Sequence, residues 1–340
     1  MKLVTIFGGT GFVGRYVAYR MAREGWRVRC ACRRPNDYPF VRTYGVVGQV
    51  EPVFCNVRDD ESVRDVTRGA DAVVNCVGIL AESGRQTFEA LQQSGAARIA
   101  RMAAEEGVET LVQVSAIGAD ESATSRYART KALGEKAVQE AFPKAVILRP
   151  SIIFGHEDEF FNRFAGMARI SPILPLVGAS TRFQPVYVDD VAAAIQMGIE
   201  GKAAPGIYEL GGPDVSTFRE WMVEMLAITK RRALIVNTPM PVAKLMGWFF
   251  DKIRWATAGL VRGPLTLDQV RNLAQDNVVH EGVKTFADLG IEPTSTEAVL
   301  PDYLWRFRPS GQYAASNESA SNLRSGPGGV KGGGNRAGFS

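Results

Sequence analysis

The stretch LVTIFGGTGFVG, residues 3–14, decides the fold of this 340-residue chain. It joins an apolar run, Leu3–Phe7, to a glycine-rich turn and then to an amphipathic stretch, Val13–Glu24. Glycine permits a tight strand-to-helix turn and close approach of the backbone to a pyrophosphate, and the start of the helix supplies free N–H groups. The order of strand, turn and helix therefore predicts a dinucleotide site, built from Gly8, Thr10, Gly11, Phe12, Val13 and Gly14.

The same alternation continues through residues 1–150. Short apolar runs separated by helical stretches such as Ala90–Glu106 predict right-handed βαβ units. We therefore expect an α/β protein with a Rossmann-type, doubly wound parallel sheet covered on both faces. The expected strands are Leu3–Phe7, Arg27–Cys32, Glu51–Val57, Ala72–Val77, Thr110–Ser115 and Ala145–Leu148.

Beyond Pro150 the alternation breaks, and repeated prolines separate shorter elements. This predicts a smaller C-terminal lobe of loops and helices over residues 151–308, with part of 180–210 completing the sheet. Residues 309–340 contain eight Gly and six Ser and almost no large apolar side chains. Such a segment cannot offset its ordering entropy, so we expect a disordered tail.

The composition limits the kinds of site and the compartment that we expect. The four cysteines and two histidines show no CxxC spacing, so we expect no metal site and reduced thiols in a cytosolic compartment. No apolar run approaches the ~20 residues of a spanning helix. The first expected strand begins close to Met1, so we expect no signal or transit peptide.

The second expected strand is followed directly by Arg33 and Arg34, where an NAD site would place an acid on the ribose. A guanidinium can instead hold a 2′-phosphate, so we expect NADP(H) rather than NAD(H). The alternative is a solvated surface pair. Residues after the third and fourth strands are expected on the adenine side and beneath the cofactor, namely Asn56 and Val57, then Cys76, Val77 and Gly78.

Three polar residues suggest a catalytic constellation. Ser115 ends the fifth strand, and Tyr127 stands four residues before Lys131, on one face of an expected helix, Ser125–Phe142. A nearby ammonium stabilises a phenolate and lowers the tyrosine pKa, and the serine can hold a substrate oxygen.

With these motifs the chain resembles the short-chain dehydrogenase/reductase superfamily, extended type. The glycine turn, Ser115, the Tyr127–Lys131 motif, residues 149–155 and residues 185–192 stand in that family's order. The resemblance implies that Tyr127, Lys131 and Pro150 also contact the cofactor. It further implies that the nicotinamide is flanked by Ile152, Ile153 and Phe154.

Residues 125–138, 153–158 and 160–164 resemble more narrowly the dehydrogenase-like accessory subunits of respiratory complex I. That resemblance implies tightly held NADPH without known turnover, and core subunits near the quinone site as partners. Tyr127 follows Ser115 by only 12 positions, which shortens a loop that shapes the substrate pocket in extended enzymes. The start at the first strand suggests a bacterial protein, peripheral on the cytoplasmic side of the inner membrane.

Charge is distributed unevenly. Residues 228–262 hold seven basic residues and one acid, a net charge of +6, whereas the whole chain carries +4. Within them, residues 241–260 place Trp248, Phe249, Phe250 and Trp255 among basic side chains, as an interfacial helix does. Burial of these aromatic residues in the lobe's own core is the alternative. We expect no nucleic-acid binding, because no recognition motif accompanies the charge.

Three functions remain open. The first is an NADP(H)-binding accessory subunit of complex I whose cofactor mainly stabilises the fold and assembly. The second is a free-standing NADP-dependent reductase or sugar-nucleotide epimerase or dehydratase that uses Ser115, Tyr127 and Lys131. The third is a sensor that reports the redox state of NADPH to a partner.

Overall fold

A computed structural model of the protein describes residues 1–243, Leu245, Trp248, residues 266–309 and Gly311. The tail expected at 309–340 and the basic aromatic segment 241–260 fall mostly outside these described residues. Among them, no helix combines the length and the apolar character that crossing a membrane requires.

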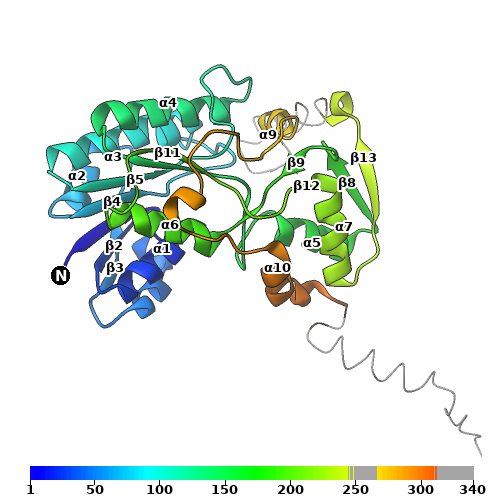
Figure 1. Ribbon diagram of the computed structural model, residues 1–340, viewed down its shortest axis with the longest axis horizontal. Coiled ribbons are helices and arrows are strands. Elements are labelled where there is room, and N and C mark those ends of the chain that lie inside the picture. Colours follow the sequence, from blue (N-terminus) through cyan, green and yellow to red (C-terminus); the bar gives the residue numbers. More distant parts are fainter. Residues whose placement is uncertain (244, 246–247, 249–265, 310, 312–340) are drawn as a thin grey trace, which may run out of the picture.

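A seven-stranded sheet, all of whose paired strands are parallel, forms the larger part of the molecule (Figure 1). Its order places β1 beside β4 and β2, so the chain winds outward in both directions from the middle. The predicted Rossmann-type doubly wound sheet is thus confirmed. From one edge to the other the strands are β11 (Gly206–Leu210), β6 (Val146–Pro150), β5 (Thr110–Val114), β4 (Ala72–Asn75), β1 (Leu3–Phe7), β2 (Arg27–Cys32) and β3 (Val50–Phe54).

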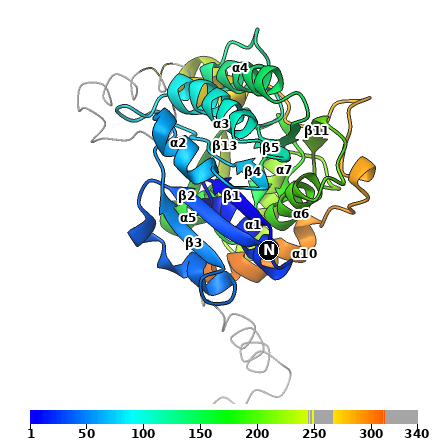
Figure 2. The same ribbon diagram turned by 90° about the vertical axis from the view of Figure 1, so that its left-hand side faces the viewer.

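Two helical layers cover the sheet because successive strand residues point to opposite faces. Val4 and Ile6 pack beneath α1 and α6, while Phe7 and Val73 pack beneath the opposite layer. Figure 2 shows the two layers on either side of the strands. One layer is α1 (Phe12–Arg23) and α6 (Val188–Ile199); the other is α2 (Asp60–Thr67), α3 (Ser94–Glu105) and α4 (Arg126–Ala141).

Local geometry modifies several predicted elements. The predicted helix Ala90–Glu106 is divided into a π-helical turn, Glu89–Gln93, and α3. Two 3₁₀ turns, Pro35–Asp37 and Pro39–Tyr44, follow β2. They begin at prolines, whose fixed φ favours the first turn of a helix.

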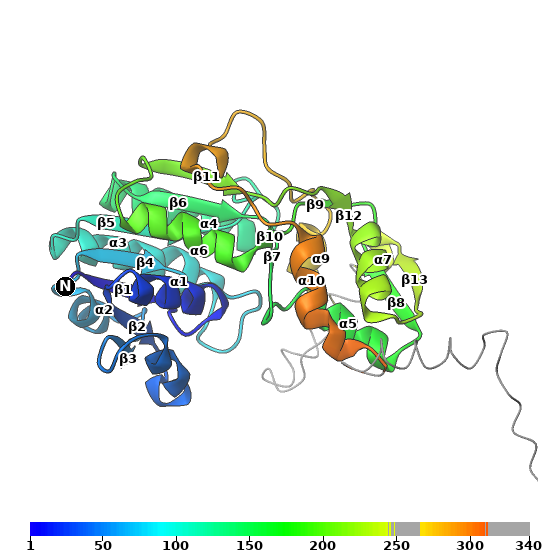
Figure 3. The same cartoon turned by 60° about the horizontal axis from the view of Figure 1, so that its bottom comes forward.

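A smaller lobe lies beside the end of the sheet toward which the strands run (Figure 3). Its core is strongly aromatic and includes Phe161, Phe183, Phe218, Trp221 and Tyr303. Its helices are α5 (Phe161–Ile170), α7 (Phe218–Thr229), α9 (Leu267–Asn272) and α10 (Thr296–Leu304), and a 3₁₀ turn spans Trp305–Phe307. A further 3₁₀ turn, Ala287–Leu289, packs instead on the core of the large sheet through Leu289.

The prediction that this lobe consists of loops and helices is wrong. Strand β8 (Ile173–Val177) pairs in parallel with β13 (Leu234–Thr238), although Pro175 lies within β8. A two-stranded sheet leaves one edge of each strand unpaired, so it tolerates a residue without an N–H group. Two further short pairs join β7 (Ile153–Phe154) to β10 (Val186–Tyr187), and β9 (Arg182–Phe183) to β12 (Ser216–Thr217).

Candidate functional site

The glycine turn is folded so tightly that two of its positions have no room for a side chain. Gly8 has φ +76°, and its carbonyl oxygen accepts a hydrogen bond from Gly11 N at 2.9 Å. A Cβ at Gly14 would clash with that oxygen and lie 2.7 Å from Gly9 Cα. A Cβ at Gly9 would lie 2.9 Å from Cys30 Cβ. The turn therefore presents bare backbone at the end of β1.

The start of α1 is suited to an anion. Gly11 is its N-cap, no side chain caps it, and no acid lies in its first turn. In contrast, Asp59 caps α2 by accepting from Ser62 N at 3.0 Å. Free N–H groups and the positive end of the helix dipole favour a phosphate. The residues present thus fit the pyrophosphate of a dinucleotide, with Phe12 and Val13 in the first turn.

Arg33 and Arg34 follow β2 and are both exposed to solvent. The Arg34 guanidinium lies 3.8 Å from the Asp37 carboxylate. Within the described ranges Arg33 forms no ion pair with any acid. Its charge is therefore available to a ligand, whereas that of Arg34 is shared.

The loop after β3 is anchored to neighbouring helices. Asn56 N donates to Ser62 Oγ at 2.9 Å, and Val57 O accepts from Arg98 Nη1 at 2.9 Å. These bonds fix the loop beside the start of α3. That this loop lies on the adenine side of the cofactor remains a prediction.

Lys131 reaches from α4 to the ends of two adjacent strands. Its Nζ donates to Val114 O at 3.2 Å, and it lies 3.5 Å from the place that a Cβ would take at Gly78. Burial lowers the pKa of Lys131 to about 8, although the Glu135 carboxylate opposes this shift. Burial also raises the pKa of the Cys76 thiol to about 12, so this thiol stays protonated at neutral pH.

Ser115 provides a second observation that fits a ligand. Its Oγ is fully buried and has no hydrogen-bond partner in the part of the chain that the structure describes. A buried hydroxyl without a partner is costly, and a ligand oxygen beside Lys131 would satisfy it. The structure thus brings Ser115, Lys131 and Gly78 together at the carboxyl ends of β4 and β5.

Tyr127 behaves differently from the sequence-based expectation. The Lys131 ammonium was expected to lower its pKa; instead, burial raises the pKa of Tyr127 to about 12. The ring is partly buried and packs edge-on against Phe88, with centroids 5.8 Å apart. Desolvation of the phenolate is the cause of this rise.

The loop after β6 comes close to the glycine turn. Pro150 ends β6, and Phe154 is fully buried. The ring of Phe12 lies 3.4 Å from the place that a Cβ would take at Gly155, so the turn after Phe154 rests on the start of α1. Ile152 and Ile153, both partly buried, lie between these two points.

Sequence reasoning missed two residues that hold the rim of this site. Asp268 of α9 accepts hydrogen bonds at the start of α4, and Asn277 Oδ1 accepts from Ser151 Oγ at 2.7 Å and from Ile152 N at 3.0 Å. A capping box from Thr266 to Gln269 signals the start of α9 in the sequence, but not its distant contacts.

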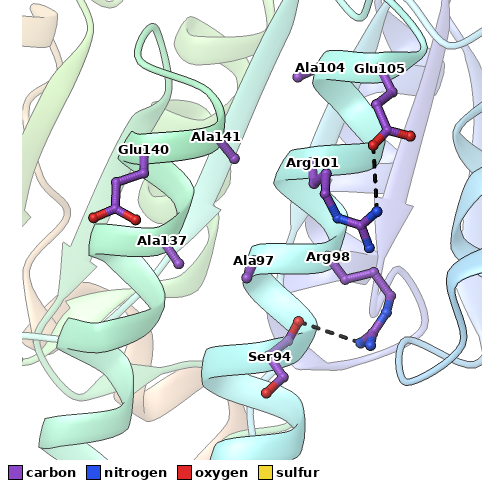
Figure 4. Close-up of a pocket in the computed structure, with 9 residues that line it drawn as sticks. All are labelled: Ser94, Ala97, Arg98, Arg101, Ala104, Glu105, Ala137, Glu140 and Ala141. Atoms are coloured by element: carbon purple, nitrogen blue, oxygen red, sulfur yellow. Dashed lines mark hydrogen bonds and ion pairs between the residues drawn. The ribbon is translucent and has the colours of Figure 1, made fainter.

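An open groove between α3 and α4 lies apart from these residues. Figure 4 shows it lined by alanines and by charged side chains such as Arg101 and Glu140. None of the predicted cofactor or catalytic residues lines it. We therefore assign it no part in nucleotide binding.

Comparisons with known proteins agree with this geometry. The model of the "NAD dependent epimerase/dehydratase family" matches residues 4–211. The chain is 35% identical, over 93% of its length and 81% of the relative's, to NADH dehydrogenase [ubiquinone] 1 alpha subcomplex subunit 9, mitochondrial, of Arabidopsis thaliana. It is 33% identical to a ceramide reductase of Caulobacter vibrioides, over 57% of this chain and 59% of that one.

A solved structure shares the fold. UDP-glucose 4-epimerase of Thermotoga maritima, crystallised with UDP-glucose, superposes with a TM-score of 0.67 over 91% of this chain and 99% of its own, at 16% identity. At that identity the likeness extends to the fold alone.

Proposed function

The chain belongs to the NAD dependent epimerase/dehydratase family, and on that premise we propose that it is an NADP(H)-binding accessory subunit of respiratory complex I. The resemblance predicted from the sequence is confirmed by the family match and by the Arabidopsis relative. That relative carries the proposal, because its similarity spans the small lobe as well as the nucleotide domain.

NADP(H) is the cofactor that the charges favour. The bare turn Gly8–Gly14 and the uncapped α1 suit the pyrophosphate, and Arg33 supplies a cation without an ion pair among the described residues. A nucleotide that binds only the folded state adds stability by mass action. The cofactor would then serve mainly to stabilise the subunit.

Two features support a mainly structural cofactor. Tyr127 has a pKa of about 12, far above the range in which a general base works at neutral pH. The loop from Ser115 to Tyr127 is short, which leaves little chain to enclose a substrate. Ser115, Tyr127 and Lys131 then act as cofactor-binding residues rather than as a working triad.

The small lobe supplies a surface for the membrane arm or for lipid. On the outward face of the β8–β13 sheet, Ile173 pairs with Leu234, and Pro175 pairs with Val236. Leu234 is 66% exposed, which is unusual for a leucine in a strand. This apolar face leads directly into the basic aromatic segment 241–260. We place it against the junction of the peripheral and membrane arms, near the quinone site, on the cytoplasmic side of a bacterial inner membrane.

The test is to recover the tagged chain from detergent-solubilised membranes. We expect it to migrate with NADH:quinone oxidoreductase and to carry NADPH. Leu234→Glu should weaken this association, because it places a charge in the apolar face. Val223→Glu is the matched control, since Val223 is 52% exposed on α7 of the same lobe but outside that face. A chain that is recovered only as a soluble monomer would refute the assignment.

The ceramide reductase relative favours a second candidate, a free-standing NADP-dependent reductase that acts through Tyr127 and Lys131. It predicts NADPH oxidation with a carbonyl substrate. Tyr127→Phe should abolish this turnover while leaving the nucleotide bound. A substrate screen without turnover would eliminate this candidate.

A further inference from the structure

The segment 266–280 returns from the small lobe and contacts the loops that follow several strands of the sheet. Gln269 Nε2 donates to Leu80 O after β4 at 3.3 Å, and Arg271 Nη1 donates to Thr124 O before α4 at 3.3 Å. Asn277 holds Ser151 and Ile152 after β6. One stretch of chain thus fastens the rim of the candidate nucleotide site on three sides.

Asp268 makes the most extensive of these contacts. Its Oδ2 accepts from Ser125 Oγ at 2.8 Å and from Tyr127 N at 3.1 Å, and its Oδ1 accepts from Arg126 N at 2.7 Å. The carboxylate therefore satisfies two of the backbone N–H groups that an isolated helix leaves unpaired, and its charge opposes the positive end of the α4 dipole. It comes from more than 140 residues along the chain.

We propose that α9 is a latch that couples retention of the nicotinamide nucleotide to the placement of the return segment, with Asp268 as the positioning residue for Tyr127 and Lys131. The inference rests on the proposed function in one respect, namely that α4 contacts NADP(H). It adds that a contact from the small lobe sets how tightly the nucleotide is held.

The physical basis is the rigidity of the first turn of α4. Tyr127 lies in that turn, and Lys131 lies one turn further on, reaching Val114 O. If Asp268 releases the turn, Tyr127 loses its fixed position and the pocket beside Ser115 loosens. By linkage, a latch that tightens nucleotide binding must itself be tightened by the nucleotide, to the same extent.

Asp268→Asn tests the latch with little change in size. Both carboxylate oxygens accept hydrogen bonds, so an amide must turn its NH₂ group toward a donor and lose at least one bond. Asp276→Asn is the matched control on the same segment. Asp276 accepts from Arg182 N and Arg182 Nε, both at 2.8 Å, and these contacts hold the segment to the small lobe instead of to α4.

The first measurement is the dissociation rate of NADPH from the full chain, monitored by the fluorescence of the nucleotide. We expect Asp268→Asn to release NADPH about tenfold faster than the wild type, and Asp276→Asn to stay within about twofold of it. Equal rates in the two variants would overturn the latch but leave the proposed function intact. A wild type that binds no NADPH would overturn both.

The second measurement is hydrogen exchange of the wild type, which does not depend on how well a variant folds. NADPH should slow amide exchange in α9 and in the first turn of α4 together. A general gain in stability would instead slow exchange across the small lobe, including α7. Protection of α4 without protection of α9 would refute the coupling.

Discussion

Two helices of the nucleotide domain follow strands of the same parallel sheet and begin in opposite ways. Helix α1 starts at Gly11 with no side-chain cap and no acid in its first turn. Helix α4 starts at Ser125, whose side chain caps it, and receives the Asp268 carboxylate as well. One helix start is left open for an anion, and the other is already neutralised by the protein.

This difference indicates that the two helix starts have separate functions. The open start of α1 can hold phosphate, which is common to NADH and NADPH. The closed start of α4 holds no phosphate and instead fixes the position of Tyr127. Binding strength should therefore depend on α1 and the glycine turn, whereas the nicotinamide end should depend on α4 and on the return segment.

Gly14→Ala should have the largest effect. The added Cβ would clash with Gly8 O, so the turn must open and the start of α1 must move. We expect NADPH affinity to fall by at least ~100-fold and the free energy of unfolding to fall by about 1–3 kcal/mol. Nucleotide titration by fluorescence and urea unfolding measure the two effects.

Gly166→Ala is the control for this change. Gly166 lies within α5, and its nearest neighbour, Phe307 Cε1, would be 3.9 Å from an added Cβ. Alanine is the better helix former, so stability should rise by about 0.5–1 kcal/mol without any change in affinity. Unchanged NADPH affinity in Gly14→Ala would mean that the α1 start does not hold the pyrophosphate.

The pH dependence of stability tests the burial of Lys131 on α4. Lys131 has a pKa of about 8 in the folded chain, below its ordinary value of 10.5. Between these two values the unfolded chain keeps the proton that the folded chain has lost. The contribution of Lys131 to the free energy of unfolding should therefore rise with pH in this window, by up to about 3 kcal/mol.

Lys131→Met removes this titration and keeps the length of the side chain. Burial raises the pKa values of Cys76 and Tyr127 to about 12, so the unfolded chain loses these protons first and their contribution to stability falls above about pH 9. Because both proteins keep these two groups, urea unfolding at pH 7 and pH 10 should show a larger rise, or a smaller fall, in the wild type than in the variant. Parallel pH profiles in the two proteins would show that Lys131 is hydrated.

Arg33→Ala separates the nucleotides at the far end of the site. Loss of a charge-assisted bond to the 2′-phosphate should weaken NADPH binding by about tenfold to a hundredfold and leave NADH within about twofold. Arg34→Ala should have a smaller effect, because Asp37 shares its charge. The measurement is a fluorescence titration with each nucleotide. Equal losses for NADPH and NADH would contradict the assignment of Arg33.

Much of the fold was predictable because its signals are local. The predicted strands Leu3–Phe7 and Arg27–Cys32 agree with β1 and β2 at both ends, since short apolar runs flanked by turn residues define them. The third strand ends at Phe54 instead of Val57. The glycine turn was equally predictable. A Cβ at any of its glycines would contact the turn's own backbone or residues on or next to a neighbouring strand.

The rest depends on contacts that no local pattern records. Asp268 meets Arg126 across 142 positions, and Asn277 meets Ser151 across 126. Strand β8 was obscured by Pro175, because only its partner β13 shows that the proline lies in a tolerant position. The pKa of Tyr127 was misjudged for the same reason, since burial against Phe88 is a tertiary fact.

The smallest expected effect concerns how Ser125 and Asp268 share the capping of α4. Ser125 Oγ accepts from Ala128 N at 3.3 Å, but Asp268 continues to accept from Arg126 N and Tyr127 N when that hydroxyl is removed. Ser125→Ala should therefore lower the free energy of unfolding by only about 0.5 kcal/mol. Asp59→Ala removes the side-chain cap of α2 and should cost about 1 kcal/mol, measured by urea unfolding of both variants. A larger cost at Ser125 than at Asp59 would show that Asp268 depends on the serine for its position, and the two would then form a single cap.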